Sequence, residues 1–275
     1  MTLEWTSWAV THVGSIRSGN EDTLVDLPDE RVWAVADGAG GHEHGEVASG
    51  LLKVALETPT VVAGADLVLQ VRARVAAVHD NLRRQADTEA EETGRPVIIA
   101  STLVVFLALG EHFACLWCGD SRAYLLRGPE MTQLSKDHSL VQELVDSGLI
   151  AAADAERHPH ANVLTRVIGG PGPAPDLDKI TGQAQPGDRF LLCSDGLFKA
   201  LDAEAITPLL AGPDPASRLI EAALAATARD NITAVVIEAS HPGSQPDHVS
   251  SAVSPTTVHD SILDADDATL MRRPT

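Results

Sequence analysis

An apolar run that stops at an aspartate and then glycines is the feature that most constrains this chain. Residues 31–42 read Arg-Val-Trp-Ala-Val-Ala-Asp-Gly-Ala-Gly-Gly-His, so a strand-like segment from Val32 to Ala36 leads directly into Asp37. An aspartate at the tip of a buried strand is held rigidly beside an open site. Asp-Gly is also a common hairpin turn, and this segment alone leaves both interpretations open.

The same arrangement occurs at three further places. Apolar runs precede Asp120 and Asp195, and another follows Asp230. If these strand ends lie at one edge of a sandwich, the carboxylates converge and repel one another unless cations neutralise them. Carboxylate oxygens are the ligands that Mg²⁺ and Mn²⁺ prefer. Four aspartates in the same setting therefore favour a metal site over four unrelated turns.

Apolar runs joined by short connections predict more strands than a Rossmann sheet would have. Strands are expected at 3–13, 31–36, 97–109, 112–118, 121–127, 189–193 and 232–238. Helices are expected at 46–57, from Asp66 along a face of Leu67, Val71, Val75, Val78 and Leu82, from Ser139 to Gly148, and from Pro215 to about 228. Residues 87–96 are expected to be a loop. The predicted fold class is α+β, a four-layer sandwich of two antiparallel β-sheets flanked by α-helices.

The composition changes after residue 239. Residues 240–275 are rich in His, Pro, Ser, Thr and Asp and poor in apolar residues, which is typical of a disordered acidic tail. Residues 1–239 are expected to form one catalytic domain. Within it, the irregular Ala-, His- and Pro-rich segment at about 147–165 is expected to be a mobile flap.

Charge and composition exclude several classes of protein. The net charge is −19, which argues against nucleic acid and anionic membrane surfaces as partners. No apolar run approaches the roughly 20 residues that span a bilayer, and residues 1–8 lack the character of a signal peptide. Three cysteines fit a reducing compartment. The expectation is a cytoplasmic monomer.

Cys115-Leu-Trp-Cys118 has the spacing of a redox or zinc motif. In a strand, residues three apart point to opposite faces, so structural packing of both thiols is the favoured interpretation.

A dinuclear metal site suits in-line displacement at phosphorus, because it binds both the attacking and the leaving oxygen. Such a site also needs a partner for the charge of the phosphate. Arg17 is the natural candidate, since a guanidinium binds phosphate oxygens bidentately. The alternative is an ordinary surface arginine.

An ordered set of motifs decides between these alternatives. In chain order they are Gly14-x-x-Arg17-x-x-Asn20-Glu21-Asp22, Asp37-Gly38-x-Gly40-Gly41-His42, Ser101-Thr102, Gly119-Asp120-Ser121-Arg122, Asp137-His138-Ser139, Ser194-Asp195-Gly196 and Asp230-Asn231-Ile232-Thr233. This set resembles the protein phosphatase 2C family, the metal-dependent Ser/Thr phosphatases of the PPM class, in their compact bacterial form. The resemblance covers roughly residues 5–238.

The resemblance implies a metal-binding role for each matching acidic residue. Asp37 would bridge two ions, with the Gly38 carbonyl as a further ligand. The remaining matches are Asp195 and Asp230 for the first ion, Glu21 or Asp22 for the second with Asp22 preferred, and Asp120 with Asp195 for a third, weaker ion. The implied cofactor is Mn²⁺ or Mg²⁺.

The resemblance also implies how substrate is bound and where this chain departs from the family. Arg17 matches the phosphate-binding arginine, and Asn231 is expected beside it at the substrate. Ala39 stands where animal members carry a histidine proposed to protonate the leaving alcohol. The general acid is therefore unassigned, and a water molecule is a better candidate than His42.

The implied function is hydrolysis of phosphoserine and phosphothreonine in proteins by attack of a water that the two ions activate, opposing a bacterial Ser/Thr kinase. The alternatives are a non-catalytic module that binds phosphoproteins or a kinase, and a dinuclear hydrolase of small phosphate esters. In the tail, Thr257-Val-His-Asp260 resembles the phosphothreonine ligands of forkhead-associated domains. An inert acidic tail is the favoured alternative to that interaction.

Overall fold

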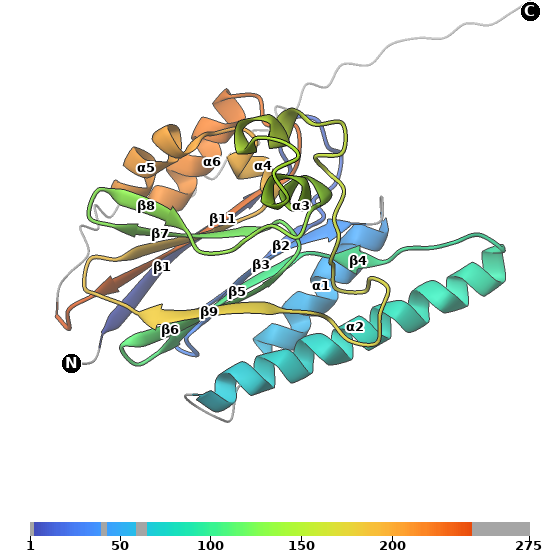
Figure 1. Cartoon of the computed structure of the whole chain (residues 1–275). Helices are drawn as coiled ribbons and strands as arrows, with labels where there is room; N and C mark the ends of the chain where they lie inside the picture. Colours follow the sequence, from blue (N-terminus) through green and yellow to red (C-terminus); the bar gives the residue numbers. More distant parts are fainter. Residues whose placement is uncertain (1–2, 40–42, 59–64, 244–275) are drawn as a thin grey trace, which may run out of the picture.

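The computed structural model describes residues 3–39, 43–58 and 65–243, and its elements form four layers (Figure 1). One sheet has the order β1-β11-β10-β7-β8, and its strands are β1 (Glu4–His12), β7 (Arg122–Arg127), β8 (Glu130–Gln133), β10 (Arg189–Cys193) and β11 (Ile232–Ser240). The other has the order β2-β3-β5-β6-β9 with β4 paired to β3, and its strands are β2 (Asp22–Leu27), β3 (Val32–Ala39), β4 (Ala100–Ser101), β5 (Leu103–Leu109), β6 (His112–Cys118) and β9 (Asp178–Gln183).

Helices cover the outer face of each sheet. The helical elements are α1 (Glu43–Glu57), α2 (Ala65–Thr93), α3 (Leu140–Asp146), the 3₁₀ helix η1 (Ala152–Arg157), α4 (Asp195–Phe198), α5 (Ala203–Ala211) and α6 (Pro215–Ala225). Helices α1 and α2 lie against the β3-containing sheet, whereas α5 and α6 lie against the β11-containing sheet (Figure 1). All strand pairs are antiparallel. The predicted four-layer α+β sandwich is confirmed.

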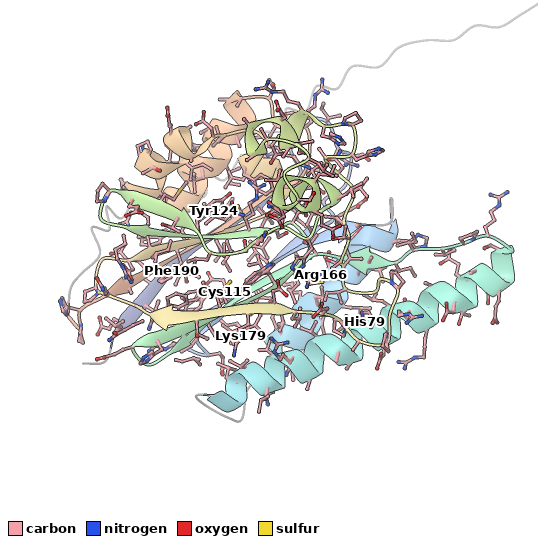
Figure 2. All side chains as sticks on the ribbon, in the orientation of Figure 1. His79, Cys115, Tyr124, Arg166, Lys179 and Phe190 are labelled. Carbon is pink, nitrogen blue, oxygen red and sulfur yellow. The ribbon has the colours of Figure 1, made fainter. Side chains whose placement is uncertain are left out.

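The central layer, between the two sheets, holds most of the buried aromatic residues. Trp33, Phe106 and Phe190 are fully buried there, and the rings of Phe106 and Phe190 lie 4.4 Å apart between centroids. Aromatic side chains bury large apolar areas, which compensates for their small number in this chain. Figure 2 shows Cys115 and Phe190 in this layer.

Two periodicity predictions are confirmed in the outer layer below the β3-containing sheet. The predicted apolar face of α2 is buried throughout, and its residues are Leu67, Val71, Val75, Val78 and Leu82. Cys118 faces this helical layer, whereas Cys115 faces the central layer. The two thiols therefore lie on opposite faces of the sheet, and the three cysteines of the chain are buried and unpaired.

Several element predictions were wrong or incomplete. Strand β3 continues through Asp37 to Ala39 because Gly38 and Ala39 pair with β4, so the hairpin interpretation of Asp-Gly is wrong. Helix α2 continues to Thr93, so the expected loop at 87–96 is wrong over most of its length. Residues 89–92 of that stretch are Glu-Ala-Glu-Glu, and both residue types are strong helix formers. Six elements had no counterpart in the prediction, namely β2, β8, β9, η1, α4 and α5.

The C-terminal part of the chain is described only as far as residue 243. Strand β11 ends at Ser240, one residue beyond the expected end of the domain. The segment Thr257–Asp260 lies outside the described residues, as does His42. Within the described ranges, no helix combines the length and hydropathy that a membrane span requires.

Candidate metal centre

Acidic residues from both sheets meet at one end of the sandwich. Asp37 lies at the end of β3, Asp195 follows β10 at the start of α4, and Asp230 precedes β11. Antiparallel neighbours place the end of one strand beside the start of the next, so residues distant in sequence reach the same edge. A pocket of about 220 Å³ opens there, and its polar walls include Arg17, Glu21, Asp37, Thr102, Asp120, Asn162, Asp195, Asp230 and Asn231.

Asp37 is fixed through its backbone by the strand that follows α2. Its amide donates to Thr102 Oγ1 at 3.1 Å, and its carbonyl accepts from Thr102 N at 2.8 Å and from Ser101 Oγ at 2.9 Å. The carboxylate is therefore left to face the pocket. Burial raises the pKa of Asp37 well above its ordinary value, and the nearby Asp22 and Asp195 add to the effect.

Asp22 lies directly opposite Asp37 in the β2–β3 register but does not line the pocket. Its Oδ2 accepts from Ser194 Oγ and from Thr233 Oγ1, each at 2.7 Å. Burial raises the pKa of Asp22 to about 7, although both hydroxyls oppose the shift. Asp22 thus ties β2 to β10 and β11, whereas its neighbour Glu21 faces the pocket.

Asp120 also lines the pocket and is 7% exposed. Burial raises its pKa to about 7, with a further contribution from the negative charge of Asp195. Burial is the main cause of the raised pKa of all three carboxyls, and repulsion from neighbouring carboxylates at this end of the sandwich adds to it.

Two cationic side chains partly neutralise this charge. Arg17 Nη2 lies 2.9 Å from Asp230 Oδ2, and Lys199 Nζ lies 2.5 Å from Asp195 Oδ2. Lys199 Nζ also donates to Asn162 Oδ1 at 2.7 Å, which links α4 to the expected flap. With these pairings in place, no three His, Cys, Asp or Glu side chains of the described chain are arranged to hold an ion. The donor set still fits a hard divalent cation, because it consists of oxygens whose charge exceeds that of the two cations.

Asn231 lines the pocket and hydrogen-bonds the loop of residues 13–21. Its Nδ2 donates to Val13 O and to Gly19 O, each at 2.9 Å, and its Oδ1 accepts from Glu21 N at 2.8 Å. Both amide hydrogens are therefore used by the loop that carries Arg17 and Glu21. This geometry is that of a residue that positions the loop.

Gly38 allows the start of α1 to approach the pocket. A Cβ on Gly38 would overlap the backbone of Gly45, and a Cβ on Gly45 would overlap the carboxylate of Glu21. The close contact between β3 and α1 therefore requires Gly38, whose Cβ would meet backbone atoms.

Thr102, Asn162 and Leu164 line the pocket and Lys199 pairs with Asp195 beside it, and none of the four was among the predicted site residues. Lys199, four residues after Asp195, carried a usable signal, because that spacing pairs two side chains on one helix face. Thr102 was part of a quoted motif but had no assigned role. Asn162 and Leu164 belong to the expected flap, and only the tertiary structure brings them to the pocket.

Comparison with known proteins agrees with this fold and site. The profile of the protein phosphatase 2C family matches residues 17–223. The chain is 38% identical over 229 residues to the serine/threonine protein phosphatase PstP of Mycobacterium tuberculosis, covering 82% of this chain and 43% of that protein. It is 31% identical over 240 residues to the serine/threonine phosphatase stp of Listeria welshimeri, covering 83% of this chain and 93% of that protein.

A solved structure gives the same result. The catalytic domain of the serine/threonine phosphatase PstP, in complex with two manganese ions, superposes with a TM-score of 0.73 at 36% identity, covering 87% of this chain and all of that one. The fold and the site, a two-sheet sandwich with an acidic pocket at one end, place the chain in the same structural class as this phosphatase domain. The chain belongs to the protein phosphatase 2C family. It spans less than half the length of the mycobacterial PstP protein that it matches.

Proposed function

We propose that this chain is a metal-dependent protein serine/threonine phosphatase that uses Mn²⁺ or Mg²⁺. The observation that carries the proposal is the pocket itself, in which Asp37, Asp195 and Asp230 line one cavity with Arg17. Membership of the protein phosphatase 2C family supports it, as does the manganese bound by the related PstP catalytic domain.

The carboxylates of Asp37, Asp195 and Asp230 would hold the ions, with the Gly38 carbonyl beside them. For the second ion, Glu21 is the better candidate than Asp22, because Glu21 lines the pocket and Asp22 is engaged by two hydroxyls. Asp120 lines the same pocket and would complete a third, weaker site with Asp195. When bound, such ions neutralise phosphate charge and lower the pKa of water.

The chain's own residues bind and orient the substrate. The Arg17 side chain is 53% exposed, and among the described residues its one hydrogen bond runs from a terminal nitrogen to Asp230. Its other donors would bind phosphate oxygens bidentately. Asn231 and Asp22 position the elements around it. Ala39 has no proton to donate, so a water molecule would protonate the leaving alcohol.

The substrates would be phosphorylated proteins, and the reaction would oppose a bacterial Ser/Thr kinase, as expected for relatives named serine/threonine protein phosphatases. Three unpaired cysteines support a cytoplasmic location. A monomeric state and a forkhead-associated partner for Thr257–Asp260 stay predictions.

Phosphate release from three substrates tests the proposal. We expect Mn²⁺-dependent hydrolysis of a phosphothreonine peptide at a kcat/KM at least about tenfold above that of a phosphotyrosine peptide or a sugar phosphate. Preference for the sugar phosphate would identify a small-ester hydrolase instead. Binding of the phosphopeptide without turnover in saturating Mn²⁺ would identify a non-catalytic module.

A further inference from the structure

A groove of about 770 Å³ lies beside the metal pocket and takes no part in the metal site. We call it the α2 groove, because the second half of α2 forms one wall. Figure 1 shows the chain leaving the end of α2 and returning along it to β4. The main lining residues are Ala86 and Asp87 on α2, Val97 and Ile98 between α2 and β4, and Leu164 and Val167 after η1.

The walls of the α2 groove are held in place by hydrogen bonds. Ser101 and Ile168 exchange two backbone hydrogen bonds of 3.0 and 2.9 Å, which join the segment before β5 to the segment after η1. Gly169 N donates to His79 Nδ1 at 3.1 Å, and Arg83 donates to Gly172 O, so the same segment is also tied to α2. Figure 2 labels His79 and Arg166 in this region. A cavity with fixed walls binds a ligand at a low ordering cost.

The α2 groove adjoins the metal pocket. Ala39, Asn162 and Leu164 line both. A chain whose phosphorylated residue entered the metal pocket would therefore pass into the α2 groove on one side. The volume lies within the range of sites that bind peptide-sized or drug-sized groups.

The lining indicates the chemistry of the occupant. Ile98 is 64% exposed and lines the groove, whereas its neighbour Ile99 is buried in the core. Asp87 makes no salt bridge with any residue in the described part of the chain, whereas Arg83 is engaged by Gly172. The groove thus offers an apolar floor, a carboxylate that forms no salt bridge with any described residue, and the guanidinium of Arg83, in a chain of net charge −19.

We infer that the α2 groove binds the segment of the phosphoprotein substrate that flanks the phosphorylated residue, taking an apolar side chain against Ile98 and a lysine or arginine beside Asp87. The inference rests on the proposed function and adds a sequence preference to it. Ile98 and Asp87 would be specificity-determining residues remote from the phosphate.

The test uses the whole 275-residue chain, Mn²⁺ and three probes. These are p-nitrophenyl phosphate, a phosphothreonine peptide with leucine and arginine on both flanks, and the same peptide with glycine and serine on the flanks. We expect wild-type kcat/KM to be about tenfold higher for the first peptide, in line with the discrimination that one apolar contact provides. Ile98→Ser should remove most of this preference, and Asp87→Asn should remove the part due to arginine. Neither change should alter hydrolysis of p-nitrophenyl phosphate.

Matched controls for the two substitutions lie on α2. Leu69 is 66% exposed and Asp80 is exposed, and neither lines the groove, so Leu69→Ser and Asp80→Asn should leave the preference intact.

Equal use of the two peptides by the wild type would overturn the inference, as would an unchanged preference in Ile98→Ser. A change of oligomeric state in Ile98→Ser would make the groove an interface between copies. Relief by that variant of inhibition by a peptide of residues 244–275 would make the tail its occupant. Failure to hydrolyse any probe, p-nitrophenyl phosphate included, would overturn the proposed function as well.

Discussion

Replacing Asp37 by asparagine is expected to lower kcat/KM for a phosphothreonine peptide by at least about 10³-fold. This is at the upper end of the decrease in rate, about 10²–10³-fold, that follows removal of one group that stabilises a transition state. Asparagine has the same shape, and the hydrogen bonds that hold Asp37 in β3 come from its backbone. The strand should therefore stay in register while the pocket loses a central negative charge. Steady-state phosphate release in saturating Mn²⁺ measures the effect.

The same substitution is expected to raise the Tm of the metal-free protein. The pKa of Asp37 is raised in the folded state, so its ionisation favours unfolding, beginning above the unfolded value of about 3.9 and increasing until the folded pKa is reached. Asparagine removes this cost at neutral pH. A gain of about 1 kcal/mol corresponds to roughly 2–4 °C in a domain of this size. Asp80→Asn is the control, because Asp80 is exposed on α2 and away from the pocket.

An inactive and more stable Asp37→Asn variant would separate the catalytic role of the carboxylate from a structural one. Full activity in that variant would refute the site. Loss of activity together with a lower Tm would indicate that Asp37 matters only for folding.

Chelation of divalent cations is expected to abolish turnover and to lower the Tm of the wild type. Asp37, Asp22 and Asp120 carry raised pKa values because burial and mutual repulsion disfavour their charged forms. A cation that binds only the folded state relieves this repulsion. At a metal concentration one hundred times Kd it stabilises by about 2.7 kcal/mol, or roughly 5–10 °C.

Thermal unfolding in EDTA, Mn²⁺ and Mg²⁺ measures this shift, with Asp37→Asn as the matched control. The Mn²⁺-dependent rise should be much smaller in the variant. Unchanged activity in EDTA would contradict the metal-dependent mechanism, and an equal rise in both proteins would place the ion elsewhere.

Local patterns predicted the layers of this fold but not all of its long-range pairings. The 3.6-residue period identified the buried face of α2, and the two-residue period placed Cys115 and Cys118 on opposite faces. The continuation of β3 past Asp37 depends on its pairing with β4, more than 60 residues further along the chain. No local signal in residues 37–39 indicates that partner.

In the candidate site, too, the residues marked by local motifs were predicted, whereas contacts between distant segments were not. Strand-end aspartates and the ordered motifs pointed to Asp37, Asp195 and Asp230, and these residues line one pocket with Arg17. The sequence does not show that Ser194 and Thr233 engage Asp22, because these contacts depend on strands distant in sequence. The preference for Asp22 over Glu21 was therefore made without this information. The α2 groove could not be predicted from the sequence either, because its walls come from three segments that are far apart along the chain.

Anomalous diffraction from crystals grown with Mn²⁺ tests the central claim most directly. The account predicts manganese peaks in the pocket, with one ion within bonding distance of Asp37 and of Asp195 or Asp230, and a second ion also bound by Asp37. Peaks absent from this pocket at millimolar Mn²⁺, or confined to carboxylates elsewhere on the surface, would contradict it.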